Sequence, residues 1–193
     1  MISILISGGM DSFVMAKLIA EQYCNNADHS NLLGVFIDWG QPCVQQERAS
    51  AKTCCDYLDI RFVEYKADIS AKEMSIGAKR PGPRVVPGRN EAFIKTAMGM
   101  DTHAVVIGCI KDDHKHYIDC RREHLNQLES KLDINIWTPL IDMTKKDIVK
   151  AGRQLPLHLT WSCYQTSTVD PCGHCSSCGE RSSAVLQGKY KWP

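Results

Sequence analysis

The chain lacks the long apolar run that a membrane span needs, and neither sign of charge dominates it. A spanning helix takes about 20 consecutive apolar residues, whereas the first apolar run, residues 1–6, ends at a serine and two glycines. The 23 Lys and Arg residues nearly match the 22 Asp and Glu residues, so the formal net charge is +1. This balance makes binding to nucleic acid or to an anionic membrane unlikely as a main function. The start of the chain also lacks the charged segment and cleavage site of a signal peptide, so we expect a soluble, cytoplasmic protein.

Two common nucleotide-binding motifs are also missing. The chain has no G-x-x-x-x-G-K-[ST] loop and no G-x-G-x-x-G fingerprint, which excludes the usual P-loop and dinucleotide-binding signatures. The composition itself is ordinary, because 44% of the 193 residues are hydrophobic and 23% are charged. Such a chain is long and apolar enough to bury a core, so disordered and fibrous classes are excluded.

Short apolar segments typical of strands alternate with segments of helical periodicity. Strands are predicted at 2–6, 32–37, 61–65, 104–107 and 134–137, and helices at 13–23, 45–58, 90–100 and 144–154. Residues 79–90 are rich in Pro, Gly and Arg and are predicted to form a loop, with Asn90 as the N-cap of the helix that follows. This alternation predicts an α/β fold, a parallel sheet with helices on both faces. From about Pro156 the pattern becomes loop-rich and cysteine-rich, so we predict a domain over 1–155 and a small lobe over 156–193 packed on it.

The turn after the first strand has the composition of a phosphate-binding loop. It reads Ser7, Gly8, Gly9, Met10, Asp11, Ser12, and in parallel sheets ligands bind at this end of the strands. The two glycines allow the backbone to approach a phosphate closely, and the start of the following helix attracts an anion. Asp11 is interpreted as bracing the loop or contacting Mg²⁺. An ordinary glycine turn is the alternative interpretation.

Ten cysteines are many for a cytoplasmic protein, in which structural disulfides are rare. Six are scattered and are interpreted as small buried hydrophobes: Cys24, Cys43, Cys54, Cys55, Cys109 and Cys120. Cys163, Cys172, Cys175 and Cys178 fall within 16 residues, which predicts a tetrahedral zinc site with no open position and therefore a structural role. Four free thiols are the alternative. We expect loss of this site to unfold the tail without directly altering the phosphate loop.

Five stretches of the chain resemble a known family. The Ser7–Ser12 loop is similar to that of the PP-loop ATP pyrophosphatases, which cleave ATP between the α- and β-phosphates. Within that superfamily, the chain resembles the 7-cyano-7-deazaguanine synthases of queuosine biosynthesis over nearly its whole length. The other four stretches are Asp38-Trp39-Gly40-Gln41, Val86-Pro87-Gly88-Arg89-Asn90, the region from Gly108 to Asp119-Cys120-Arg121, and the cysteine tail with its C-x-x-C-x-x-C spacing. The chain departs from the family at Lys115-His116-Tyr117-Ile118, where the family has Ser-Gly-Tyr-Pro, and in the length of the loop before Val86.

The resemblance implies a PP-loop ATP pyrophosphatase fold and an ATP-dependent ligase. Its expected substrates are 7-carboxy-7-deazaguanine and ammonia, which become the nitrile through an acyl-adenylate and an amide. The resemblance further implies ATP, Mg²⁺ and structural zinc as cofactors, and a homodimer.

The resemblance also assigns residues to roles. Catalytic roles fall to Asp11, Arg89 and Lys111; nucleotide binding to Ser7, Gly8, Gly9, Met10, Asp11, Ser12 and Arg89; substrate binding to Asp113, Tyr117, Asp119 and Arg121; and metal binding to Cys163, Cys172, Cys175 and Cys178. Arg89 and Lys111 are alternatively ordinary surface charges, and Asp119 alternatively braces Arg121. The cluster of Asp112, Asp113, His114 and His116 is alternatively a catalytic metal site.

Three other functions stay open from the sequence. A related enzyme would stop at the amide or adenylate another carboxylate. A tRNA-thiolating PP-loop enzyme is a second alternative, although such an enzyme is expected to carry a basic patch. A nucleotide-binding or zinc-stabilised module without turnover is the third.

Overall fold

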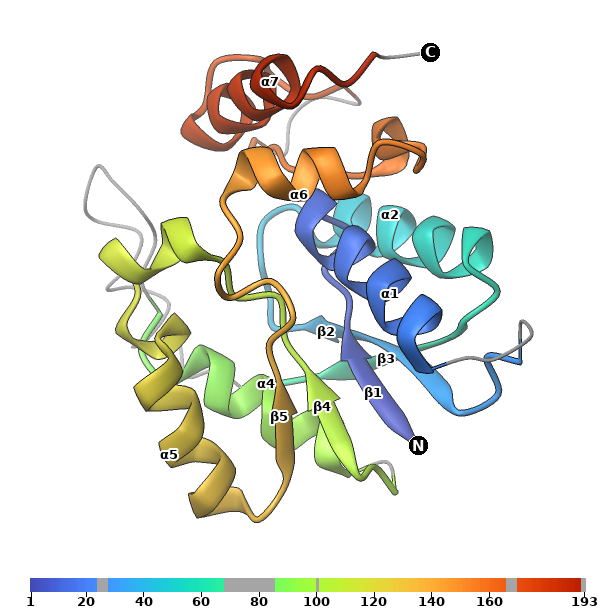
Figure 1. The fold of residues 1–193 in the computed structure, drawn as a ribbon, viewed down its shortest axis with the longest axis vertical. Coiled ribbons are helices and arrows are strands. Elements are labelled where there is room, and N and C mark those ends of the chain that lie inside the picture. Colours follow the sequence, from blue (N-terminus) through green and yellow to red (C-terminus); the bar gives the residue numbers. More distant parts are fainter. Residues whose placement is uncertain (24–27, 68–85, 100, 166–169, 192–193) are drawn as a thin grey trace.

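A computed structural model describes the chain except for residues 24–27, 68–85, 100, 166–169 and 192–193. Five parallel strands form its centre (Figure 1). They are β1 (Ile2–Leu5), β2 (Leu32–Asp38), β3 (Arg61–Lys66), β4 (Ala104–Val106) and β5 (Asn135–Trp137), in the order β3-β2-β1-β4-β5. The predicted parallel α/β sheet is therefore confirmed, with each strand end within one residue of its expected place.

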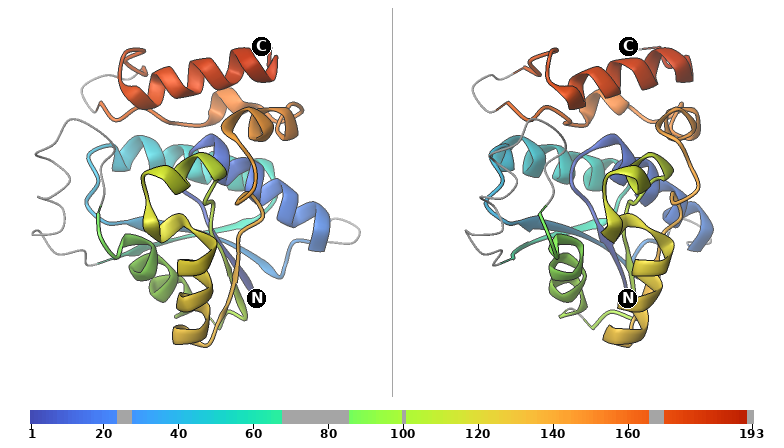
Figure 2. Two further views of the ribbon diagram at one scale, coloured as in Figure 1. Left: turned by 60° about the vertical axis from the view of Figure 1, so that its left-hand side comes forward. Right: turned by 90° about the vertical axis from the view of Figure 1, so that its left-hand side faces the viewer.

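Helices cover both faces of the sheet (Figures 1 and 2). On one face lie α1 (Met10–Tyr23), α2 (Val44–Tyr57) and α6 (Lys145–Ala151), with α7 (Ser176–Gly188) packed outside α6; on the other lie α4 (Arg89–Met98) and α5 (Arg122–Leu132). β2 shows why both faces are apolar, because Leu32 and Phe36 join the core under α1 while Leu33, Val35 and Ile37 join the core under α4. A strand buried on both sides reads as a continuous apolar run for this reason.

Two of the helices differ from what the sequence predicts. Asn90 is not an N-cap, because α4 already begins at Arg89 and Gly88 precedes it with a left-handed φ of 73°. The helix α5 was not predicted at all, since its sequence is mostly polar and only Leu125 and Leu128 are buried. For both helices the apolar periodicity is too short to define an end.

The tail beyond Pro156 is not mainly loop, because it contains the 13-residue helix α7. Its first half, S-S-C-G-E-R-S-S, is poor in strong helix formers, which is why the sequence did not predict it. Packing compensates for this propensity. Ala184 and Val185 join the core beneath α1, and Gly188 lies so close to α6 that an added Cβ would be 2.4 Å from Val149 Cγ1. The division at residues 155 and 156 stays a prediction.

None of the helices in the described part of the chain is both long and apolar enough to cross a lipid bilayer.

Candidate functional site

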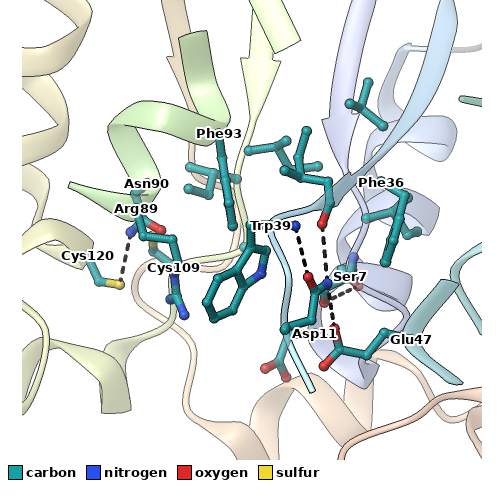
Figure 3. A pocket seen from close by; sticks show the side chains of 18 of the residues that line it. Ser7, Asp11, Phe36, Trp39, Glu47, Arg89, Asn90, Phe93, Cys109 and Cys120 are labelled. Atoms are coloured by element: carbon teal, nitrogen blue, oxygen red, sulfur yellow. Dashed lines mark hydrogen bonds between the residues drawn. The ribbon is translucent and has the colours of Figure 1, made fainter. Parts of the chain in front are cut away.

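A cavity opens at the carboxyl ends of β1 and β4, where the strand order reverses (Figure 3). Open parallel sheets bind their ligands at this switch point. Ser7 and Asp11 line the cavity from the turn after β1, Glu47 from α2, Arg89 from α4, and Asp113 from the loop after β4. Segments far apart in the sequence thus bring three carboxylates, a guanidinium and the predicted phosphate loop to one cavity.

The phosphate loop is closed on itself by its two serines. The Ser7 backbone N–H donates to Ser12 Oγ at 3.2 Å, and Ser12 Oγ donates to the Gly9 carbonyl at 3.0 Å. Because α1 begins at Met10, the second half of the motif forms the first helical turn, whose N–H groups have no partner within the helix. The Met10 side chain is 1% exposed and belongs to the core, so only its backbone is available to a ligand.

Gly8 and Gly9 serve different purposes. Gly8 has a φ of 79°, and a Cβ there would lie 2.4 Å from the Glu47 carbonyl oxygen and 2.9 Å from the Ala51 nitrogen. The close packing of the loop on α2 therefore requires a glycine at position 8. From the sequence, both glycines were expected to serve the approach of a phosphate. A Cβ on Gly9 would meet only ordinary contacts, at 3.4 Å from Ser7 Oγ and 3.7 Å from the Trp161 carbonyl oxygen.

Asp11 forms an ion pair that the sequence did not reveal. Its Oδ2 lies 2.5 Å from Lys145 Nζ, while its Oδ1 is buried and has no hydrogen-bond partner within the described residues. Thr144 is the N-cap of α6 in a capping box with Asp147, which places Lys145 in the first turn. Burial alone would lower the pKa of Lys145, but the nearby carboxylates of Asp11 and Asp113 outweigh it and raise that pKa.

An aromatic and cationic wall faces Asp11 across the cavity. The Arg89 guanidinium lies over the Phe93 ring at 5.9 Å, and the Phe93 and Trp39 rings are 6.4 Å apart. Figure 3 shows Trp39 between Arg89 and Ser7. Arg89 Nε is buried without a hydrogen-bond partner in the parts that the structure describes. A planar ring and an anionic group are the ligands that such a wall suits.

Two partly buried carboxylates line the same cavity. Burial raises the pKa of Glu47, although a hydrogen bond from Gln41 Nε2 at 3.0 Å and the charge of Arg89 oppose the rise. Burial likewise raises the pKa of Asp113, opposed by the Ile110 N–H, which donates to Oδ2 at 3.2 Å.

The other residues assigned to the substrate lie away from the cavity lining. Burial, with Tyr164 nearby, raises the pKa of Tyr117 to about 12. Arg121 is exposed and donates from Nε to the His114 carbonyl at 3.0 Å. No ion pair joins Asp119 to Arg121, both of which lie in the part of the chain that the structure describes. Lys111 is exposed and does not line the cavity either. Roles for Tyr117, Asp119, Arg121 and Lys111 stay predictions.

The four tail cysteines come together, whereas the proposed histidine cluster does not. The ligand atoms of Cys163, Cys172, Cys175 and Cys178 all lie within 4.8 Å of one another, and no second group of this kind occurs among the described residues. A tetrahedron with metal–sulfur bonds of about 2.3 Å has edges of about 3.8 Å, and Cys172 Sγ and Cys178 Sγ are 4.0 Å apart. The spacing therefore fits one metal ion. Asp112, Asp113, His114 and His116 form no comparable group in this part of the chain.

The scattered cysteines are buried, as predicted. Cys43, Cys54, Cys55, Cys109 and Cys120 are at most 5% exposed, and burial raises the pKa of Cys54 and of Cys55 to about 12. These two thiols stay protonated at neutral pH and are unreactive. Cys24 lies outside the described residues.

One short segment joins the cysteine cluster to the phosphate loop. The Trp161 N–H donates to the Gly8 carbonyl at 2.8 Å, and Trp161 is followed two residues later by Cys163. Arg181 of α7 ties the same segment down, donating to Thr160 Oγ1 at 2.8 Å and to the Leu157 carbonyl at 2.7 Å. This contact links the tail directly to the phosphate loop, so whether loss of the tail leaves the loop unchanged stays a question for experiment.

Comparison with known families decides the identity. The family model described as "Queuosine biosynthesis protein QueC" matches residues 2–188. The chain belongs to the QueC family. It is 32% identical to the 7-cyano-7-deazaguanine synthase of Chlorobaculum parvum, with 92% of this chain and 88% of that relative covered. It is 31% identical to the enzyme of the same name from a Nitratiruptor species, with 91% and 89% covered. The resemblance that the motifs indicated is thus confirmed.

Solved structures support the fold of this QueC chain. A predicted subunit of tRNA methyltransferase from Methanocaldococcus jannaschii superposes with a TM-score of 0.56 at 20% identity, covering 79% of this chain and 74% of that one. The U34-tRNA thiolase NcsA from Methanococcus maripaludis, solved with its [4Fe-4S] cluster, gives a TM-score of 0.56 at 19% identity, covering 96% and 64%. At these identities the likeness shows the fold alone.

The raised pKa of Glu47 predicts that Glu47→Gln stabilises the protein at neutral pH. An amide removes the cost of burying a charge, so we expect a gain of about 0.5–1 kcal/mol in the free energy of unfolding. The folded-state pKa lies above the ordinary value of 4.5, so the carboxylate destabilises the fold progressively as the pH rises from that value. The gain should therefore be full at neutral pH and vanish below about pH 4.5. Denaturant titrations at several pH values test this, and a gain that grows on acidification would contradict it.

Proposed function

We propose that the chain is an ATP-dependent ligase that converts 7-carboxy-7-deazaguanine and ammonia into 7-cyano-7-deazaguanine. The observation that carries this proposal is membership of the QueC family over residues 2–188. The cavity supports it, because a phosphate loop, a guanidinium and an aromatic wall meet at one place.

The chemistry explains why ATP is needed. A carboxylate is a poor electrophile, and attack of its oxygen on the α-phosphate gives an acyl-adenylate and releases diphosphate. Ammonia displaces AMP and leaves the primary amide. A second ATP activates the amide oxygen, whose loss as AMP leaves the nitrile, so both carboxylate oxygens end on AMP. Placement and charge stabilisation are the protein's contribution.

We assign the phosphates to the loop and to Arg89. The N–H groups of the first turn of α1 and the hydroxyls of Ser7 and Ser12 would hold the β- and γ-phosphates. Arg89, whose Nε is buried and without a partner among the described residues, would neutralise charge that develops on the α-phosphate.

We assign the deazapurine to the wall formed by Trp39 and Phe93. A planar heterocycle stacks favourably on such rings. Asp113 lines the cavity and can accept the N–H groups of a guanine-like edge, in keeping with the role predicted for it. A homodimer stays a prediction that size-exclusion chromatography with light scattering would test.

We propose zinc for the four-cysteine site. Four sulfur ligands leave no open position, so the ion would crosslink the tail and take no part in the reaction. Mg²⁺ is expected to accompany ATP, and the buried Oδ1 of Asp11, which has no partner among the described residues, is a suitable oxygen ligand for it.

The test is a reconstituted reaction with the purified chain, 7-carboxy-7-deazaguanine, ammonium, ATP and Mg²⁺. We expect the mass of the nitrile together with about two AMP and two diphosphates for each product formed. Arg89→Met should lower the rate at least about 100-fold, whereas Arg122→Met should not, because Arg122 pairs with Asp142 on the surface. Amide as the only product, or ADP and phosphate in place of AMP and diphosphate, would overturn the proposal.

A further inference from the structure

Lys145 is the only residue that the structure places in an ion pair with the phosphate loop, among the residues it describes. The pair joins positions 134 residues apart in the chain. It brings the ammonium against Asp11, which lines the cavity in the first turn of α1. Lys145 therefore stands beside the place where the diphosphate is expected.

The negative charges around the expected diphosphate position require a cation nearby. Asp11 and Asp113 both line the cavity, and a triphosphate would add several further negative charges beside them. Among the described residues that line the cavity, Arg89 is the only one with a cationic side chain. A carboxylate in a phosphate loop repels its ligand unless a cation or metal ion lies between them.

Lys145 is built to supply that cation. Its backbone is held by the N-cap of α6 and by Asp112 Oδ2, which accepts from the Lys145 N–H at 2.9 Å. Its side chain is 26% exposed and that of Asp11 25%, so the ammonium is not sealed in the core. The four-carbon stem can turn while the backbone stays in place.

We propose that Lys145 binds the diphosphate part of ATP directly, and that Asp11 holds its ammonium in position before the nucleotide arrives. This adds a diphosphate-binding residue that the sequence did not reveal, and it rests on the proposed function only in naming ATP as the source of the diphosphate. A bound phosphate oxygen then shares the ammonium with Asp11.

Titration calorimetry with magnesium pyrophosphate tests this on the intact protein. We expect Lys145→Met to weaken pyrophosphate binding by about 10- to 100-fold, the effect of one charge-assisted hydrogen bond. Lys145→Arg should retain most of the affinity. Lys146→Met is the matched control, because Lys146 is the next residue on α6, exposed and in no ion pair within the described chain.

A second comparison separates phosphate binding from a purely structural ion pair. The same Lys145→Met change is made in an Asp11→Asn background, which leaves no unpaired carboxylate and so guards against misfolding. If Lys145 binds phosphate, its loss weakens pyrophosphate binding in both backgrounds. If it only braces Asp11, the loss has no effect once Asp11 is neutral, and the proposal is overturned.

The outcome is independent of the nitrile assay. Pyrophosphate binding needs no deazapurine, so a wild-type chain that makes no nitrile would refute the proposed function while leaving this test intact. A chain that makes nitrile and whose Lys145→Met variant binds pyrophosphate as tightly as wild type would refute only the role of Lys145.

Discussion

Cys175→Ser is expected to abolish metal binding and also to weaken ATP binding by at least about tenfold. A structural four-cysteine site contributes on the order of 10 kcal/mol to folding, so its loss frees Cys163. The segment before Cys163 holds the phosphate loop through the 2.8 Å bond from the Trp161 N–H to the Gly8 carbonyl. Loosening this segment should therefore loosen the loop. Metal analysis and calorimetric titration with ATP measure the two effects.

His174→Ala is the matched control for this prediction. His174 lies between two of the cysteines and is exposed, and its Nδ1 is bonded only locally, 2.8 Å from the Cys172 carbonyl oxygen. It should keep about one metal per chain and the wild-type affinity for ATP. If Cys175→Ser loses its metal but binds ATP as tightly as wild type, the contact between Trp161 and Gly8 does not couple the metal site to ATP affinity, and the prediction is wrong.

The three central strands were predictable because β1, β2 and β4 are buried on both faces of the sheet. β1 and β2 are continuous apolar runs that end at turn-forming residues, and nothing in their surroundings changes that local signal. Helices α5 and α7 were not predictable in the same way. α7 depends on Ala184 and Val185 packing into a core built from distant segments, and such tertiary contacts override a weak local propensity.

The same distinction applies to the site. The phosphate loop and the four cysteines are local motifs whose spacing carries their chemistry, so they were predicted by residue. Lys145 was missed, because its partner lies 134 positions away and nothing in its own segment marks it. Lys111, to which the resemblance gave a catalytic role, has an exposed side chain. The reason for Gly8 was likewise hidden until α2 was seen to lie against it.

Gly8→Ala is expected to destabilise the whole fold. The left-handed φ of 79° costs an alanine about 1–2 kcal/mol, and its Cβ would lie 2.4 Å from the Glu47 carbonyl oxygen, a backbone atom that cannot turn away. Displacing α2 adds about 1–3 kcal/mol. We therefore expect a loss of about 2–5 kcal/mol in the free energy of unfolding, measured by denaturant titration with the metal site loaded.

Gly9→Ala is the matched comparison. It should leave the stability of the fold nearly unchanged and lower the affinity for ATP. Its Cβ meets only ordinary contacts, so the free energy of unfolding should change by less than about 1 kcal/mol. The added methyl group would instead stand where the backbone faces the phosphates, so affinity for ATP should fall about tenfold or more. Gly8 would thus permit the packing of the loop on α2, and Gly9 would permit the close approach of the phosphates. A Gly9→Ala protein with normal ATP affinity would place the phosphates elsewhere, and a stable Gly8→Ala protein would show that α2 yields without cost.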